Sequence, residues 1–176
     1  MLFLDETSTQ TVMTRRRGRA PRGQRVIGRV PRNHGPNVTC LMAISPTGVQ
    51  APCVFEGALD GALFVRWVED WLVPCLAPGT TVILDNLSVH RHPGVPAAIE
   101  AAGAHLRFLP PYSPDFNPIE LIFAKLKTHL RGAEARAFEP LVEEIGRGLA
   151  TITPADLRAC YRHCGYAFAG EERQTP

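Results

Sequence analysis

The sequence predicts an α/β fold, with a central sheet of mixed strand direction and helices on both of its faces. Two observations support this prediction. β-rich apolar runs alternate along the chain with segments whose apolar residues recur at helical spacing. Two of the runs are also neighbours joined by a short turn, as in a hairpin. The order is strand, hairpin, helix, strand, helix, strand and then three helices, which is typical of such a sheet.

The first half of the chain is expected to supply three strands and one helix. SPTG (45–48) lies between two β-rich runs and is typical of a four-residue hairpin loop. Pro74 ends a stretch in which apolar residues keep helical spacing. The expected elements are strands at 2–5, 37–44 and 49–57 and a helix at 60–73.

The second half is expected to supply two strands and four helices. Gly103 is a C-terminal helix stop, and Thr153-Pro154 stands in N-cap and N1 positions. The expected elements are strands at 80–86 and 105–109 and helices at 95–102, 118–130, 138–150 and 154–163. We expect residues 1–168 to form one domain and residues 169–176 to be a disordered tail.

Composition excludes several classes of protein. With 45% hydrophobic and 20% charged residues, the chain can bury a real core. It contains no apolar run of 18 residues and begins with no signal peptide, so we expect no membrane contact. Its five cysteines include no CxxC pair and are expected to be reduced thiols in a cytoplasmic protein. CYRHC (160–164) indicates a helix end rather than a zinc site, because a second ligand pair is missing.

The net charge of +2 conceals an asymmetry. From Thr7 to Phe55 there is no Asp or Glu, and the rest of the chain carries 11 basic and 17 acidic residues, a net charge of −6. A basic segment on an acidic body favours a polyanionic partner, most simply nucleic acid. The alternative is a compositional bias towards arginine. The arginines of the segment are Arg15, Arg16, Arg17, Arg19, Arg22, Arg25, Arg29 and Arg32.

Two predicted strands, LFLD and VILD, end alike, at Asp5 and Asp85. In open α/β sheets, ligands gather at the carboxyl ends of strands. Two aspartates there repel each other unless a cation lies between them. The alternative is that each aspartate only closes its strand as a turn or cap residue.

Glu120 has two possible roles in the helix that follows the loop PPYSPDFN. Asn117 at the N-cap, Pro118 at N1 and Glu120 at N3 fit a variant of the capping box. Glu120 also shares a helix face with Lys127 and Arg131, which would suit a metal and a phosphate backbone. A solvated face could show the same pattern.

Three carboxylates form a minimal set for metal-assisted phosphoryl transfer. Asp and Glu oxygens are the ligands that Mg²⁺ or Mn²⁺ prefers. Two such ions can activate the attacking oxygen and stabilise the leaving one.

The chain resembles the catalytic domain of DDE transposases, specifically the mariner-like group and its bacterial insertion-sequence relatives. The segments that carry the resemblance are FLDET (3–7), PRGQRV (21–26), ILDNLSVH (83–90) and PPYSPDFNPIELIF (110–123). The 34 residues from 86 to 119, between Asp85 and Glu120, are also typical of that group.

The resemblance implies an RNase H-like fold in which Asp5, Asp85 and Glu120 form the catalytic and metal-binding triad for two Mg²⁺ or Mn²⁺ ions. Asn86 and His90 match the family pattern Asp-Asn-x-x-x-His and, with Asn117, would support the triad from a second layer. Tyr112, Ser113, Pro114 and Asn117 look like scaffolding that places the Glu120 helix. The expected DNA-binding residues are Arg15, Arg16, Arg17, Arg19, Arg22, Arg25, Lys127 and Arg131.

The sequence departs from the family in two places. Phe123 stands where relatives often carry Trp, and the helix-turn-helix modules usual upstream of the first catalytic Asp are absent, which points to a split or truncated transposase. The expected function is metal-dependent cleavage and strand transfer at transposon terminal inverted repeats and target DNA. The expected form is a bacterial, nucleoid-associated homodimer on DNA, with a possible upstream DNA-binding partner chain. The alternative is a catalytically silent DNA-binding remnant with the same fold.

Overall fold

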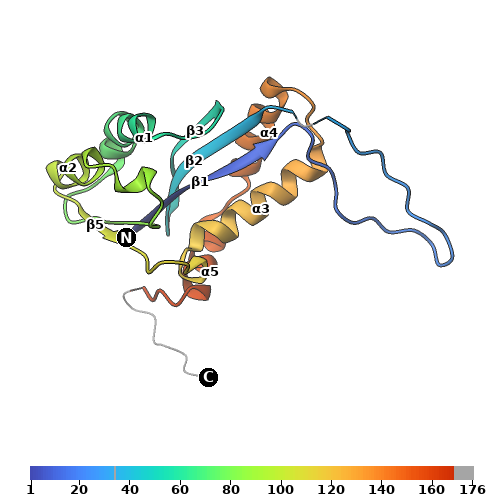
Figure 1. Ribbon diagram of the computed structural model, residues 1–176. Coiled ribbons are helices and arrows are strands. Elements are labelled where there is room, and N and C mark those ends of the chain that lie inside the picture. The colour runs from blue at the N-terminus through green and yellow to red at the C-terminus, as the bar shows by residue number, and fades with distance from the viewer. Residues whose placement is uncertain (34, 169–176) are drawn as a thin grey trace.

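The computed structural model describes residues 1–33 and 35–168, and a five-stranded mixed sheet lies at its centre (Figure 1). In spatial order the strands are β3 (Gly48–Glu56), β2 (Asn37–Ser45), β1 (Leu2–Gln10), β4 (Thr81–Leu84) and β5 (His105–Phe108). β1, β4 and β5 run parallel to one another, whereas β2 pairs antiparallel with both β1 and β3. The predicted mixed sheet is therefore confirmed.

Helices cover both faces of this sheet. On one face, Leu2 and Leu4 of β1 share a core with α1 (Gly61–Trp67) and α2 (Gly94–Ala101). On the other face, Phe3 packs in a core with α3 (Pro118–Ala133) and α5 (Pro154–His163). The alternation of neighbouring residues between two cores follows from the two-residue repeat of a strand. α4 (Phe138–Ala150) packs beside α3 over β2.

The first strand is longer than predicted, and this changes the position of Asp5. β1 continues to Gln10, so Asp5 lies in the middle of a strand, opposite Met42 of β2. Thr7 and Thr9 extend the strand because their β-branched side chains suit a pleated surface and β2 offers them partners. The prediction that Asp5 ends its strand is wrong, whereas Asp85 does follow β4 directly.

The segment between β1 and β2 leaves the body of the protein. Its described residues in the range 11–36 form no helix or strand and extend away from the sheet as a long loop (Figure 1). We refer to residues 11–36 as the basic arm. All eight arginines of the acid-free segment lie on it.

The remaining elements lie close to their predicted ranges. The 60–73 helix is divided into α1, a π-helical turn at Val68–Leu72 and a 3₁₀ turn at Val73–Cys75. α3 extends beyond residue 130 to Ala133, and Glu134 ends it with a left-handed backbone. α4 and α5 have the predicted bounds.

Two further expectations concern helix ends and membranes. No potential metal cluster among the described residues includes Cys160 or Cys164, and Cys164 is the C-cap of α5. Within residues 1–33 and 35–168, no helix has the length and apolar character needed to cross a bilayer. The tail expected at 169–176 lies outside the described residues.

Candidate active site

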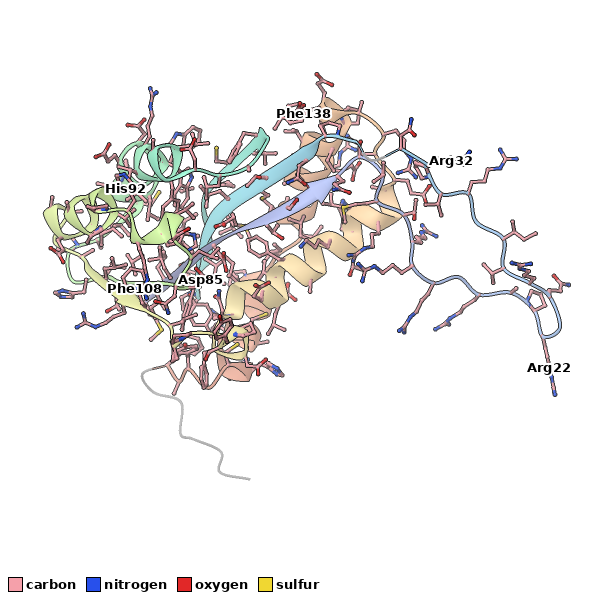
Figure 2. The ribbon with its side chains drawn as sticks, in the orientation of Figure 1. Arg22, Arg32, Asp85, His92, Phe108 and Phe138 are labelled. Atoms are coloured by element: carbon pink, nitrogen blue, oxygen red, sulfur yellow. The ribbon has the colours of Figure 1, made fainter. Side chains whose placement is uncertain are left out.

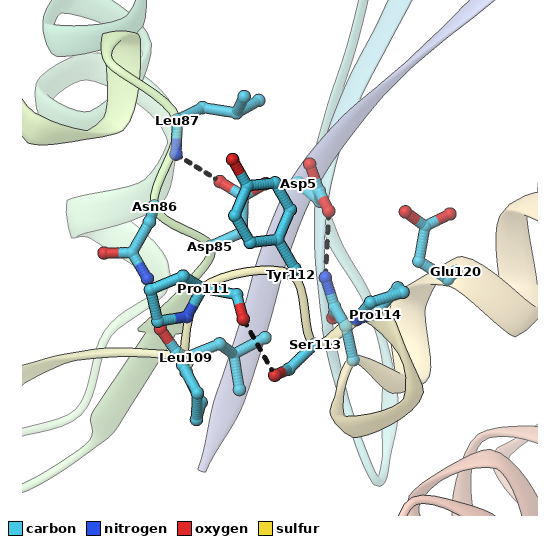
Figure 3. Close-up of a pocket in the computed structure, with 12 residues that line it drawn as sticks. Asp5, Asp85, Asn86, Leu87, Leu109, Pro111, Tyr112, Ser113, Pro114 and Glu120 are labelled. Atoms are coloured by element: carbon cyan, nitrogen blue, oxygen red, sulfur yellow. Dashed lines mark hydrogen bonds between the residues drawn. The ribbon is translucent and has the colours of Figure 1, made fainter.

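A cavity opens between the end of β4 and the loop that precedes α3 (Figure 3). Asp5 reaches it from β1, Asp85 from the end of β4, and Glu120 from the first turn of α3. The other lining residues are Asn86, Leu87, Leu109, Pro110, Pro111, Tyr112, Ser113, Pro114 and Asn117. Three carboxylates from three separate elements therefore face one space.

Asp5 is buried, and its two carboxylate oxygens have different partners. Oδ1 accepts a hydrogen bond from the Glu6 backbone N–H at 2.8 Å, and Oδ2 accepts one from Asn117 Nδ2 at 2.9 Å. Burial, together with the negative charges of Glu6 and Asp85, raises the pKa of Asp5 to about 7, against the lowering effects of the Glu6 N–H hydrogen bond and of the His90 charge. At neutral pH the fold thus holds Asp5 close to its point of half-protonation.

His90 joins Asp85 to a carboxylate that the sequence did not single out. Its ring is completely buried and lies against Phe64, with 4.7 Å between the ring centroids. His90 Nδ1 lies 2.6 Å from Asp85 Oδ1, and His90 Nε2 lies 2.8 Å from Glu6 Oε2. The imidazole is therefore fixed at both nitrogens, and it holds one oxygen of Asp85 in place.

The charges of Asp85, His90 and Glu6 stabilise one another. Burial alone would lower the pKa of His90, but the hydrogen bonds to Asp85 and Glu6 outweigh it and raise the pKa to about 9. Burial alone would raise the pKa of Asp85, but hydrogen bonds from His90 and from the Leu87 N–H bring it below its ordinary value. A protonated His90 between two carboxylates is consistent with both directions.

The capping interpretation of Glu120 is not supported. Asn117 is the N-cap of α3, but its side chain makes no capping hydrogen bond and instead donates to Asp5. The Glu120 side chain is exposed, and among the described residues no hydrogen-bond partner is found for its carboxylate. Glu120 therefore faces the cavity without making a capping hydrogen bond at the start of α3.

Asn86 connects the two strand ends that border the cavity. Its Nδ2 donates to the Leu109 carbonyl, and its Oδ1 accepts from Arg91 Nη2. The bond to Leu109 attaches the segment after β4 to the segment after β5, and the bond from Arg91 lies within the segment after β4. Of the three residues expected in a supporting layer, His90 and Asn117 hydrogen-bond directly to Asp85 and Asp5, whereas Asn86 bonds to the Leu109 carbonyl and to Arg91.

The predicted DNA-binding residues lie outside the cavity, on two elements. Arg22 stands at the tip of the basic arm and Arg32 closer to the body (Figure 2). Lys127 and Arg131 lie on α3. Burial lowers the pKa of Arg131, and the positive charge of Arg16 lowers it further. Arg16 of the arm and Arg131 of α3 are therefore close enough to interact, and the arm and α3 form one basic region. Arg15, Arg16, Arg17, Arg19, Arg22 and Arg25 are all exposed.

Glu6 is the residue that sequence reasoning missed. It directly follows Asp5 in FLDET. Because consecutive side chains of a strand point to opposite faces, the strand pattern did not predict that Glu6 would lie near Asp5. Among the described residues, the group of possible metal ligands whose atoms lie within 4.8 Å of one another is Asp5, Glu6 and His90. The acidic pair was visible in the sequence, but its histidine partner lies 84 positions away.

The sequence matches one family. The profile of a family described as DDE superfamily endonuclease matches residues 1–142. No curated protein matches the sequence.

Solved structures share the fold. A pre-cleavage Mos1 transpososome matches with a TM-score of 0.73 at 15% identity, over 95% of this chain and 56% of that chain. The Mos1 mariner paired end complex with Mn matches with a TM-score of 0.72 at 17% identity, over 93% of this chain and 51% of that chain. The catalytic domain of Mos1 mariner transposase matches with a TM-score of 0.61 at 14% identity, over 95% of this chain and 83% of that chain.

These matches confirm the expected RNase H-like fold. The chain spans about half the length of the Mos1 chains in the two DNA-end complexes.

Proposed function

The chain belongs to the DDE superfamily endonucleases, and from this premise we propose that it is a transposase catalytic domain. Its reaction is metal-dependent cleavage of DNA phosphodiester bonds, followed by strand transfer, at the ends of a transposable element. The observation that carries the proposal is the convergence of Asp5, Asp85 and Glu120 on one open cavity. The fold shared with a Mos1 strand transfer complex, at 18% identity, supports it.

Asp5, Asp85 and Glu120 would hold the divalent metal, as two Mg²⁺ or Mn²⁺ ions. The cavity suits a cation for two reasons. Burial and the negative charges of Glu6 and Asp85 raise the pKa of Asp5, and a bound cation would offset both effects by stabilising the ionised carboxylate. Within the described part of the chain, the buried Asn117 Oδ1, beside Asp5, has no hydrogen-bond partner and is a hard oxygen ligand. When bound, such ions supply positive charge to the attacking and leaving oxygens of a phosphodiester.

The other residues of the site orient these carboxylates. Asn117 holds one Asp5 oxygen, and His90 holds one Asp85 oxygen. Each aspartate therefore presents its unused carboxylate lone pairs to the cavity in a fixed orientation. Hydrogen-bond partners that orient metal ligands in this way raise metal affinity. Among the described residues Glu120 has no such partner, so its carboxylate can adjust when substrate arrives.

The basic arm and α3 would bind the DNA backbone. Arg15, Arg16 and Arg17 begin the arm near α3, where Lys127 and Arg131 lie. Cationic side chains position a duplex by phosphate contacts without reading its sequence. The proposed substrates are the terminal inverted repeats and target DNA. We also propose that the protein works as a homodimer on DNA in the bacterial nucleoid and that an upstream DNA-binding chain contributes end recognition.

Nicking of supercoiled plasmid tests the proposal. Wild-type protein should nick the plasmid in the presence of Mn²⁺, whereas Asp85→Asn and Glu120→Gln should not, because each substitution removes a charged metal ligand. Asp70→Asn is the matched control, since Asp70 is an exposed carboxylate on the π-helical turn away from the cavity. DNA binding without any Mn²⁺-dependent nicking would instead support a silent remnant with the same fold.

A further inference from the structure

Tyr112 combines two features that packing does not explain. Its side chain is fully exposed, at 103% of the reference area, although an aromatic ring gains by burial. Its backbone has a φ of +54°, in the left-handed region that disfavours every residue with a Cβ. A glycine would relax the backbone at this point, so the ring stands there at a conformational cost. Tyr112 is not the scaffolding that the sequence suggested.

The loop around Tyr112 is held firmly at both ends. Asn86 Nδ2 donates to the carbonyl of Leu109, and the Tyr166 hydroxyl donates to the carbonyl of Phe116 at 2.8 Å. The Ser113 hydroxyl donates to the Pro111 carbonyl at 3.2 Å, and three prolines further restrict the backbone. The ring is therefore presented on a rigid support, which lowers the entropy lost when it binds a partner.

The ring also borders the carboxylate cavity (Figure 3). Among the described residues, no hydrogen bond or ring contact is found for Tyr112. Leu87 and Leu109 add apolar side chains to the lining of the same cavity, which also includes Asp5, Asp85 and Glu120. A ligand that contacts the ring thus offers an apolar face to Tyr112 while a neighbouring group reaches the carboxylates.

We propose that Tyr112 is a stacking platform for an unpaired nucleobase of the DNA strand whose phosphate lies at the carboxylates. A nucleotide has a flat π-face one sugar away from its phosphate, and base–aromatic stacking accepts any base. A paired base within a duplex has both faces covered by its neighbours, so the platform selects a base that is frayed, overhanging or extruded. The inference rests on the proposed function, because it takes DNA as the occupant of the cavity.

Oligonucleotide binding without divalent metal tests the platform, because cleavage then does not contribute. Tyr112→Ala should weaken binding to a duplex with a short single-stranded overhang by about 5- to 150-fold, the range for loss of one stacked base. Tyr112→Phe and Tyr112→Trp should retain binding, and affinity for a blunt duplex should stay unchanged. Trp71→Ala is the matched control, since Trp71 is 53% exposed and lies outside the cavity.

An abasic overhang makes the test specific to the base. Wild-type protein should lose the same factor when the overhang lacks its bases, and Tyr112→Ala should lose nothing more, so the two changes should be strongly non-additive. The slope of log Kd against log salt should be the same for wild type and Tyr112→Ala, because no phosphate contact is removed. Tyr112→Gly relaxes the left-handed backbone. This variant should bind like Tyr112→Ala, and its melting temperature should be no lower than that of Tyr112→Ala.

Three results would overturn the platform. They are equal overhang binding by Tyr112→Ala and wild type, additive effects of Tyr112→Ala and the abasic overhang, and a Tyr112→Phe variant as weak as Tyr112→Ala. None of these bears on nicking. Nicking by Asp85→Asn at the wild-type rate would contradict the proposed function whatever the overhang experiment gives.

Discussion

Asp5 carries its carboxylate in the interior of the protein, and this has a thermodynamic consequence. Its pKa rises from an ordinary 3.8 to about 7, chiefly through burial. Between these values the folded protein holds a proton that the unfolded chain has released. Stability from the protonated carboxyl is complete below about pH 4 and is lost as pH rises through about 7.

Asp5→Asn should remove this pH dependence in metal-free buffer, because an amide does not ionise. We expect the free energy of unfolding of wild type, relative to Asp5→Asn, to fall by a few kcal/mol, in order of magnitude, between pH 4.5 and pH 7.5. Urea titrations of both proteins at each pH measure the difference. A difference that stays constant with pH would show that Asp5 ionises normally in the fold.

Glu120, unlike Asp5, should contribute little to the stability of the fold. Because it neither caps α3 nor packs in the core, Glu120→Gln should melt within a few degrees of wild type in metal-free buffer. The loss of one negative charge in the first turn of an exposed helix costs about 0.3–1 kcal/mol. Thermal melts followed by circular dichroism measure this. A drop of ten degrees or more would assign Glu120 a structural role.

At the scale of elements, the basic arm carries a cluster of positive charge that is distinct from the acidic body of the protein. Replacing Arg15, Arg16 and Arg17 by Ala should flatten the log–log salt dependence of duplex binding by roughly 2–3 units, if all three contact phosphates. The matched control replaces Arg66, Arg107 and Arg158, three exposed arginines of the body, and should leave the slope unchanged. Equal slopes for wild type and the arm variant would show that these arginines do not contact phosphates and reflect a compositional bias towards arginine.

Arg136 attaches the root of the arm to the segment between α3 and α4. Its Nη1 donates to the carbonyls of Thr11 and Met13 at 3.1 and 2.8 Å, and its Nη2 pairs with Glu134 at 3.1 Å. Lysine cannot reproduce this fork because its donors sit on one nitrogen.

Arg136→Lys should therefore loosen the arm without unfolding the body. We expect limited trypsin digestion to cleave the arm several times faster in Arg136→Lys, with a melting temperature within a few degrees of wild type. Mass spectrometry of the fragments locates the cuts. Arg147→Lys is the control, since the pairs of Arg147 among the described residues are with Glu143 and Glu144 of its own helix. Equal digestion rates would mean that Arg136 does not hold the arm.

At the scale of the whole molecule, the carboxylate cavity joins elements that are far apart in the chain. β1, the end of β4 and the start of α3 contribute one carboxylate each. A ligand that binds all three stabilises the folded state by mass action, since the unfolded chain does not assemble the site.

Millimolar Mn²⁺ should therefore raise the melting temperature. At a concentration 100 times the Kd the gain is about 2.7 kcal/mol, which for a chain of this size corresponds to roughly 5–10 °C. Asp85→Asn and Glu120→Gln should lose most of the shift, and Asp70→Asn should keep it. Differential scanning fluorimetry across a Mn²⁺ series measures the effect. A flat series for wild type would count against a preformed metal site.

The sequence by itself determined the elements and much of the chemistry. Helical spacing and helix-end residues gave α4 and α5 their bounds, because such signals are local. Asp85 was identifiable from the strand it follows, and the basic arm from a 49-residue window without an acid. These features depend on neighbouring residues alone.

Only the tertiary structure decided which side chains meet. The extension of β1 beyond Asp5 depends on its pairing with β2, which no local pattern records. His90 reaches Glu6 across 84 positions, and Asn117 reaches Asp5 across 112, so these contacts arise from strand register and helix placement. Tyr112 looked like scaffolding because a sequence does not report exposure. Its position beside the carboxylates follows from the loop that the fold holds between β5 and α3.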